Sequence, residues 1–420
     1  MFDWFLAGFN AFIDLGAAVM MPIIFFILGL IVKVKPSTAL KSGLLMGVGF
    51  EGIGVMVGLM LDGLSPAANA IVDRLGLNLT VVDVGWPVAA QIGWGTAIVP
   101  FAVIGAIVIN IIFLAFKWTR VVNIDLYNFN HFMIIGAIIY AGTGNLLAGI
   151  VCCLVVSTLA LILGDKVADK IVEDTGVENV TYVNAFAGMQ VPVAMAVNKI
   201  IEKIPKVRDI NMSSAAINKR FGIVGEPIAL GLIMGVILGI GAGFDINTIL
   251  QLSIKISAAM VLLPKMVGIL VEGLEPIKEA MKEMLKKKMP DRDIFLALDV
   301  GMMITDETLA VGILLIPVAL LLAVILPGNK VLPLVDLSSL FWFVVMIKPF
   351  CKGNMFRMFI TGCVILVISL YVAGDIAPMY TLAAEMAGTH MPEGASAVTN
   401  LITGATSIVA WIVTKIGLLF

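Results

Sequence analysis

The chain has 420 residues, of which 60% are hydrophobic and 13% are charged, with a formal net charge of −2. Soluble domains carry about 25% charged residues, so this composition, with a mean hydropathy of +1.07, excludes an ordinary soluble domain. The small net charge identifies no partner, and no nucleic-acid partner is expected.

Long apolar runs occur throughout the chain. A helix needs roughly 20 apolar residues to cross a hydrocarbon core of about 30 Å. Several runs reach that length: Ser42–Leu61, Thr96–Phe116, Thr308–Leu326 and Val398–Leu419. A transmembrane β-barrel would show short alternating segments instead. The sequence therefore predicts an all-α polytopic protein of the lipid bilayer.

The first residues, MFDWFLAGFNAFIDLG, have no basic region and include Asp3 and Asp14. They are therefore not expected to form a cleaved secretory signal. The cysteines lie in or beside apolar runs without metal-ligand spacing, and we expect them to be packing residues. They are Cys152, Cys153, Cys351 and Cys363. No metal, cofactor or catalytic residue is expected.

The two halves of the chain resemble each other. Val55–Pro66 (VMVGLMLDGLSP) aligns with Lys265–Pro276 (KMVGILVEGLEP) at an offset of 210. Five shorter pairs follow in the same order at offsets between 209 and 217: Asp83-Val-Gly with Asp299-Val-Gly, Val99-Pro100 with Ile316-Pro317, Asp125-Leu126 with Asp336-Leu337, Gly144-Asn145 with Gly353-Asn354, and Gly164-Asp165 with Gly374-Asp375. This order predicts a five-helix repeat in residues 1–165 and again in 223–375. A link at 166–222 joins the copies, and 376–420 holds an extracellular loop and a final helix.

The distribution of basic residues predicts the orientation of the copies, because Lys and Arg gather on the cytoplasmic side. In the first copy they follow the first helix, at Lys33, Lys35 and Lys41. In the second copy they follow the second helix, within Lys278–Arg292. The copies are therefore expected to be inverted, with eleven crossings, the N-terminus outside and the C-terminus inside. The eleventh crossing is expected at Val398–Leu419.

His131–Leu163 has two interpretations. One helix of this length would measure about 50 Å, and the break at Gly142-Thr-Gly-Asn145 favours two short crossings. If the segment were one tilted helix, Asn184–Ile201 would supply the missing crossing. Otherwise that stretch is expected to be an amphipathic or hairpin element at the cytoplasmic face.

Two polar segments, Val81–Thr96 and Leu298–Leu309, interrupt the apolar pattern once in each half. Non-helical backbone at membrane depth is tolerated only where protein or a water-filled cavity satisfies its polar groups. Both segments are therefore predicted to be re-entrant hairpins that line a cavity between the repeats. Ionisable residues inside a membrane are costly, so the acidic residues here are candidates for function.

The side chains available in these segments suit a polar, uncharged ligand. Carboxylates accept several hydroxyl hydrogen bonds, an amide both donates and accepts, and an indole presents a flat apolar face. The candidate substrate-binding residues are Asp83, Trp86, Gln91, Glu226, Asp299, Asp306 and Glu307. Neither hairpin contains Arg or Lys, which argues against a phosphorylated or carboxylate substrate.

Structural alternatives exist for several candidates. Asp83 and Asp299 could cap the helices that follow them, and Trp86 could anchor the protein at the membrane interface. Glu226 could be a first-turn residue favoured by the helix dipole. Glu51 is expected either in the cavity or hydrogen-bonded in a helix interface.

Four motifs then resemble the galactitol-type membrane subunit, EIIC, of the bacterial phosphoenolpyruvate-dependent sugar phosphotransferase system (PTS). They are LNLTVVDVGWP (Leu77–Pro87), FGIVGEP (Phe221–Pro227), ILPGNKVLPLVDL (Ile325–Leu337) and KGNMFRM (Lys352–Met358). The resemblance implies a homodimer in the bacterial cytoplasmic (inner) membrane, with elevator-type alternating access. It assigns Asp83, Trp86, Glu226 and Asp299 to the substrate-binding region.

The resemblance also implies partners. EIIC carries the sugar or polyol across, a separate EIIB subunit phosphorylates it from a phosphocysteine, and EIIA phosphorylates EIIB. The chain departs from the galactitol subunits at Thr305-Asp306, where they have Gly-His, and at Asn184, where they have His. Another hexitol, a pentitol or a ketose is therefore expected to fit as well as galactitol.

Two other functions are compatible with the embedded carboxylates. An ion-coupled secondary transporter would use Asp83, Asp299 or Glu51 as a proton carrier. An intramembrane aspartyl protease would use Asp83 and Asp299 as its dyad, with divergent pKa values. No water-activating neighbours recur around that pair, which disfavours the protease.

Overall fold

The computed structural model describes residues 17–76, 81–123, 125, 129–210, 212, 227–288, 292–333, 335–389 and 396–420. Helices make up most of this part, as the composition predicts. The α-helices are α2 (Ala17–Ile31), α3 (Pro36–Leu75), α4 (Trp86–Trp94), α5 (Val99–Ala115), α6 (Asn130–Thr143), α7 (Leu146–Thr175), α8 (Val191–Ile201), α10 (Pro227–Ala242), α11 (Ile246–Lys288), α12 (Asp306–Ile325), α13 (Met355–Met386) and α14 (Ile408–Gly417).

Short strands and 3-10 helices lie where the helices are interrupted. The strands are β1 (Val81–Asp83), β2 (Val121–Asn123), β3 (Val180–Thr181), β4 (Phe295–Ala297), β5 (Val331–Leu332) and β6 (Ala397–Thr399). The 3-10 helices are η2 (Gly188–Gln190), η4 (Val300–Met303), η5 (Asp336–Phe343), η6 (Lys348–Cys351) and η7 (Gly404–Thr406).

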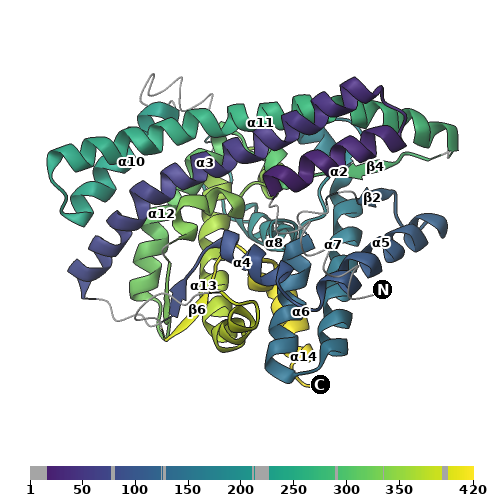
Figure 1. Cartoon of the computed structure of the whole chain (residues 1–420). Coiled ribbons are helices and arrows are strands. Elements are labelled where there is room, and N and C mark those ends of the chain that lie inside the picture. The colour runs from purple at the N-terminus through teal and green to yellow at the C-terminus, as the bar shows by residue number, and fades with distance from the viewer. Residues whose placement is uncertain are drawn as a thin grey trace.

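The two longest helices, α3 and α11, pack against each other along one side of the molecule (Figure 1). Each also packs on the helix before it, α2 on α3 and α10 on α11. Close approach of α10 to α11 requires glycine, since a Cβ at Gly235 would overlap the backbone of Ser253. Figure 1 shows α6, α7, α12, α13 and α14 on the other side of this layer.

Two small parallel sheets connect the halves of the chain. In the first sheet β1 lies between β5 and β6, and in the second β4 lies between β2 and β3. Each central strand thus comes from one half of the sequence and both of its neighbours from the other. Val81 pairs with Val331 and Ala397, while Phe295 pairs with Val121.

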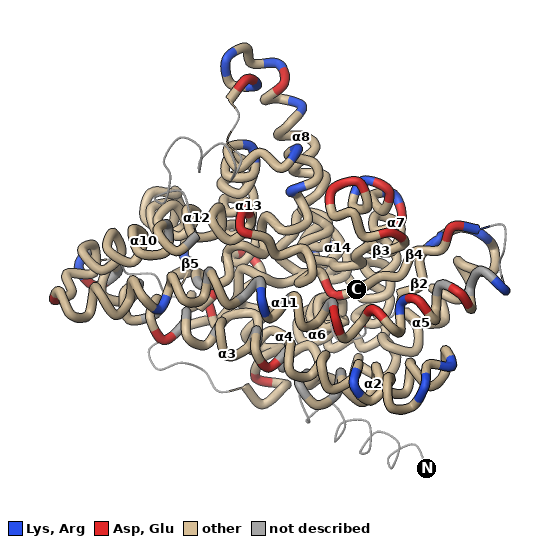
Figure 2. The backbone as a smooth tube through the Cα atoms, turned by 90° about the horizontal axis from the view of Figure 1, so that it is seen from above, with Lys and Arg blue, Asp and Glu red and all other residues tan. Residues whose placement is uncertain are grey.

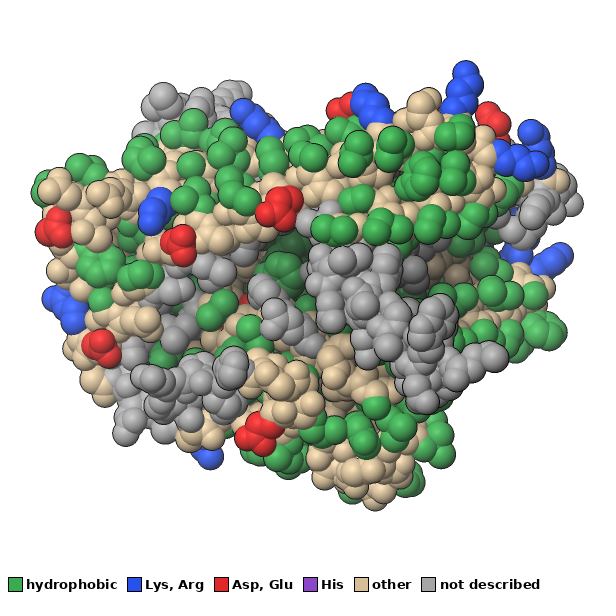
Figure 3. Space-filling model, in the orientation of Figure 1, with side chains coloured by type: hydrophobic (Ala, Val, Ile, Leu, Met, Phe, Trp, Pro, Cys, Tyr) green, Lys and Arg blue, Asp and Glu red, His purple; other side chains and the backbone are tan. Residues whose placement is uncertain are grey.

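Four described helical stretches are long and apolar enough to cross a bilayer, and α4 with α5, bent by 85°, would make a fifth. The four are Pro36–Met56, Leu146–Thr175, Asp306–Ile325 and Met355–Met386. The protein is therefore a helical membrane protein, while the number of eleven crossings stays a prediction. Figure 3 shows hydrophobic side chains covering much of the surface over α3, α10 and α11, as a lipid-facing surface requires.

The expected break in His131–Leu163 is confirmed. Helix α6 ends at Gly144, whose φ of 69° is left-handed, and Asn145 begins α7 by accepting a hydrogen bond from the Ala148 N–H. The segment expected as an alternative crossing contains α8, whose 11 residues span only about 17 Å. The interpretation as one tilted helix was wrong.

The end of the chain differs from the expected helix at Val398–Leu419. It contains β6, an irregular stretch with η7, and then α14, which has 10 residues. Gly404 explains part of the difference, because the segment passes so close to the His131 carbonyl that a Cβ there would overlap it. Apolar composition alone could not distinguish this buried strand and turn from a helix.

Candidate functional site

A buried carboxylate lies at the end of β1, the central strand of the first sheet. Asp83 is fully buried, and its Oδ1 accepts a hydrogen bond from the Gly85 N–H at 2.9 Å. Its Oδ2 accepts the Asp336 N–H at 2.8 Å, from the other half of the chain. Gly85 has a φ of 81°, a left-handed conformation that suits glycine. Asp83 thus fixes the turn into α4.

Asp336 extends this network to three segments. Its Oδ1 accepts the Trp86 N–H at 2.9 Å, and its Oδ2 accepts the N–H groups of Leu401 and Ile402, both at 2.8 Å. Buried carboxylates require such hydrogen bonds to offset the loss of hydration. The two aspartates therefore hold the start of α4 against η5 and the segment after β6.

Besides the Tyr380 hydroxyl, four residues near this pair carry buried polar atoms that have no hydrogen-bond partner within the described residues. These atoms are the indole Nε1 of Trp86, the side-chain oxygen of Asn130, both amide atoms of Asn400 and the hydroxyl of Thr403. We call these four residues the polar cluster. Asn400 is fully buried, while Trp86 is half-buried.

The fold brings the polar cluster together. Trp86 follows β1 and Asn400 follows β6, and because these strands are parallel neighbours both residues lie at the same edge of the sheet. Asn130 lies against α4, where a Cβ on Gly93 would be 3.0 Å from the Asn130 carbonyl. Gly404, next to Thr403, contacts the backbone of His131. Buried polar groups normally have partners, so these atoms are available for hydrogen bonds that the described residues do not make.

The second predicted hairpin has a different arrangement. Asp299 caps η4, with its Oδ1 accepting the Gly301 N–H at 2.7 Å. Thr305 caps α12, and Asp306 and Glu307 occupy its first turn, where a helix dipole favours acids. The cavity beside Asp299 has a volume of about 10 Å³, about enough for one water molecule. A polyol would not fit there.

The structure therefore brings together Asp83 and Trp86 from the predicted set. Asp299, Asp306 and Glu307 belong to the other sheet and to the helix after it. Gln91 lies in α4, but its side chain is not among those described, and Glu226 lies outside the described residues. Glu51 is exposed on α3, so its expected place in the cavity or in a helix interface stays a prediction.

Asp336 and three members of the polar cluster, Asn130, Asn400 and Thr403, were absent from the prediction. Asp336 had a signal, because it is the repeat partner of Asp125 and an acid in an apolar region. The other three had none, since single Asn and Thr residues in apolar stretches are ordinary.

Membrane-spanning helices, a bent helix pair at a sheet edge and buried polar groups without partners among the described residues are features expected of a membrane permease. The model of the family described as the PTS system sugar-specific permease component, EIIC-GAT, matches residues 11–394. The chain belongs to this family.

Curated relatives agree over almost the whole chain. The galactitol-specific EIIC component of Escherichia coli (strain K12) is 35% identical over 399 residues, which cover 93% of this chain and 88% of the relative. A putative permease IIC component of the same strain is 33% identical over 397 residues, 94% of this chain and 91% of the relative. The chain is thus a multi-pass transport subunit of the PTS, not the subunit that transfers the phosphoryl group.

Proposed function

We propose that the chain carries galactitol or a related polyol inward and presents it to a separate EIIB subunit, itself charged by EIIA. The polar cluster is the observation that carries this proposal. It offers the donors and acceptors that neutral hydroxyl groups need, and neither hairpin adds a Lys or Arg for an anionic substrate. The names of the curated relatives support the substrate class.

We further propose that the halves are inverted repeats that move as an elevator within a homodimer, with eleven crossings. The exchange of strands supports the repeat, because β1 with β5 and β6 mirrors β4 with β2 and β3. In this correspondence β3 and β6 are equivalent, so each repeat would extend beyond the boundaries at residues 165 and 375. The basic residues after the first helix of one half and the second helix of the other support inversion.

Binding of radiolabelled galactitol to the purified protein in nanodiscs tests the site. Trp86→Phe keeps an aromatic ring, although a smaller one, and removes the indole N–H, and we expect galactitol affinity to fall about three- to tenfold. Asn400→Leu should lower it at least as much. Trp118→Phe is the matched control, because Trp118 is 63% exposed. Equal affinities in all three variants would place the substrate elsewhere.

Uptake into vesicles tests the coupling. With EIIA, EIIB and the general PTS proteins inside, we expect a phosphorylated polyol to accumulate only when phosphoenolpyruvate is present. Accumulation of unmodified polyol that requires only a proton gradient would instead establish an ion-coupled secondary transporter.

A further inference from the structure

A second cavity is lined by none of the polar-cluster residues. It lies between the ends of α7 and α8, η6 and the start of α13. Its volume is about 650 Å³, and its lining includes Lys170, Met195, Lys199, Glu202, Lys352 and Arg357. Figure 2 shows that α8 and the charged segment after it project from the body of the molecule. We call this space the basic cavity.

The basic cavity carries an excess of positive charge. Four of the charged residues in its lining are cationic and only Glu202 is anionic. The Glu202 carboxylate is already occupied, at 2.8 Å from Lys352 and 2.7 Å from Arg357. Lys199 has neither an ion pair nor a hydrogen bond within the described part of the chain, and its side chain is exposed. An anionic ligand would balance the excess positive charge of the basic cavity.

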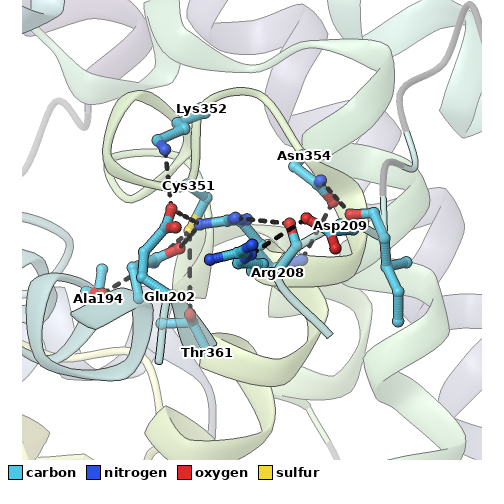
Figure 4. A network of polar contacts seen from close by, with 11 residues as sticks. Ala194, Glu202, Arg208, Asp209, Cys351, Lys352, Asn354 and Thr361 are labelled. Carbon is cyan, nitrogen blue, oxygen red and sulfur yellow. Dashed lines mark hydrogen bonds and ion pairs between the residues drawn. The ribbon is translucent and has the colours of Figure 1, made fainter. Parts of the chain in front are cut away.

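The wall of the basic cavity is held in place before any ligand arrives. Arg357 is 4% exposed, and its guanidinium donates to the Asn198 side-chain oxygen at 3.4 Å and to the Arg208 carbonyl at 3.0 Å (Figure 4). Asn354 donates to the Ile210 carbonyl at 2.7 Å. These bonds fix α8 and the following segment against α13, so binding there would require little ordering.

Apolar side chains adjoin the cations. Met195 and Ile200 of α8 are 57% and 60% exposed. Buried apolar contacts beside charged groups are typical of protein–protein interfaces. The basic cavity therefore resembles a docking surface for a protein more than a site for a free ion.

We propose that the basic cavity receives the phosphoryl-bearing loop of the EIIB subunit. This inference rests on the proposed function. The Lys-rich link to which α8 belongs is on the cytoplasmic side by the distribution of basic residues, and EIIB acts on that side. A volume of about 650 Å³ exceeds a single phosphate group and falls within the range of about 300–1,000 Å³ for small-ligand sites, so a loop carrying a phosphorylated side chain fits.

Binding of purified EIIB to the chain in nanodiscs of zwitterionic lipid tests the inference. We expect phosphorylated EIIB to bind more tightly than unphosphorylated EIIB, and this preference to weaken at high salt. Lys199→Gln and Lys170→Gln should each lower the affinity about three- to tenfold. Lys330→Gln is the matched control, an exposed lysine in the loop between α12 and β5.

Galactitol binding to the same samples separates the two proposals. If the inference is correct, the lysine variants bind galactitol normally, but limiting EIIB phosphorylates galactitol more slowly with these variants than with the native chain. Unchanged EIIB affinity in both lysine variants would overturn the docking site while leaving the permease intact. The lysine variants could instead bind EIIB normally but bind a phosphorylated polyol, or the anionic lipid of a nanodisc, more weakly than the native chain does. That result would assign the cavity to that ligand. Absence of galactitol binding in the native chain would refute the proposed function itself.

Discussion

Asp336 shows how a single buried side chain connects distant parts of this chain. Its carboxylate accepts three backbone N–H groups, one at the start of α4 and two after β6, and its own N–H donates to Asp83. Only a carboxylate has enough acceptor positions for all three, because an amide replaces one oxygen with a donor. The residue therefore determines where Trp86 and Asn400 lie.

Replacing Asp336 by Asn should leave at least one buried backbone N–H facing another donor. We expect the free energy of unfolding to fall by about 2 kcal/mol and galactitol affinity to fall with it. Thermal unfolding in detergent measures the first effect. Asp306→Asn is the control, since Asp306 is exposed and loses only a favourable helix-dipole interaction of about 0.3–1 kcal/mol. Equal stability losses would contradict this role of Asp336.

Glu202 gives a prediction about pH. Hydrogen bonds from Lys352 and Arg357 lower the pKa of its carboxyl group from its usual value of 4.5 to about 2. Because the folded pKa is depressed, the stabilisation is fully present above about pH 4.5 and is lost as the pH falls through about 2. Hydrogen exchange of residues 199–210, corrected for intrinsic rates, should show this loss. Glu202→Gln should abolish this pH dependence. An unchanged pH profile of hydrogen exchange in that variant would contradict the role of Glu202.

At the scale of elements, Gly-Asn pairs begin two of the long helices. Gly144 and Gly353 adopt left-handed φ angles of 69° and 62°, and the asparagine after each caps α7 or α13. Glycine tolerates this conformation and asparagine accepts the first free N–H groups, so the pair favours a helix start. The break predicted at Gly142-Thr-Gly-Asn145 is one of these two sites.

The two caps should differ in their effects when removed. Asn145→Ala loses a cap and should cost about 1 kcal/mol of stability. Asn354→Ala also loses the bond to the Ile210 carbonyl, so we expect an additional loss of protection in residues 198–212. Limited proteolysis of the two variants measures this difference. Comparable cleavage of that segment in both would show that Asn354 acts only as a cap.

Other elements could not be predicted, for physical reasons. Strands of two or three residues are too short to show alternation, and their partners lie between 116 and 316 residues away in sequence, so no local signal exists. The same applies to Asn400, which follows such a strand. Asp83 and Trp86 were predictable because polar residues in an apolar setting stand out.

At the scale of the whole molecule, basic residues gather at defined ends (Figure 2). The basic cavity is one such region. The turn between α2 and α3, with Lys33 and Lys35, and the start of α3, with Lys41, form another. The inverted arrangement requires both to face the cytoplasm. Lys330, in the loop before β5, should then face outward.

Labelling of single cysteines in intact cells tests this arrangement. In a chain whose native cysteines are replaced by Ser, Lys330→Cys should react with a membrane-impermeant maleimide, whereas Lys199→Cys should react only after permeabilisation. Both positions are exposed in the structure, so lack of access would reflect the membrane. Labelling of both from the same side would contradict the inverted repeat.

The pairing of β1 with strands from the other half of the chain also determines when its sheet can form during synthesis. β1 cannot complete its sheet until Val331 and Ala397 have been synthesised, the second more than 300 residues later. At about 5–20 residues per second the ribosome needs roughly 15 to 60 s for that distance. Asp83 can accept the Asp336 N–H only after 253 further residues have been synthesised, and its last strand partner follows later still. The contacts that bury Asp83 against the second half of the chain therefore form late, after most of the chain has been synthesised.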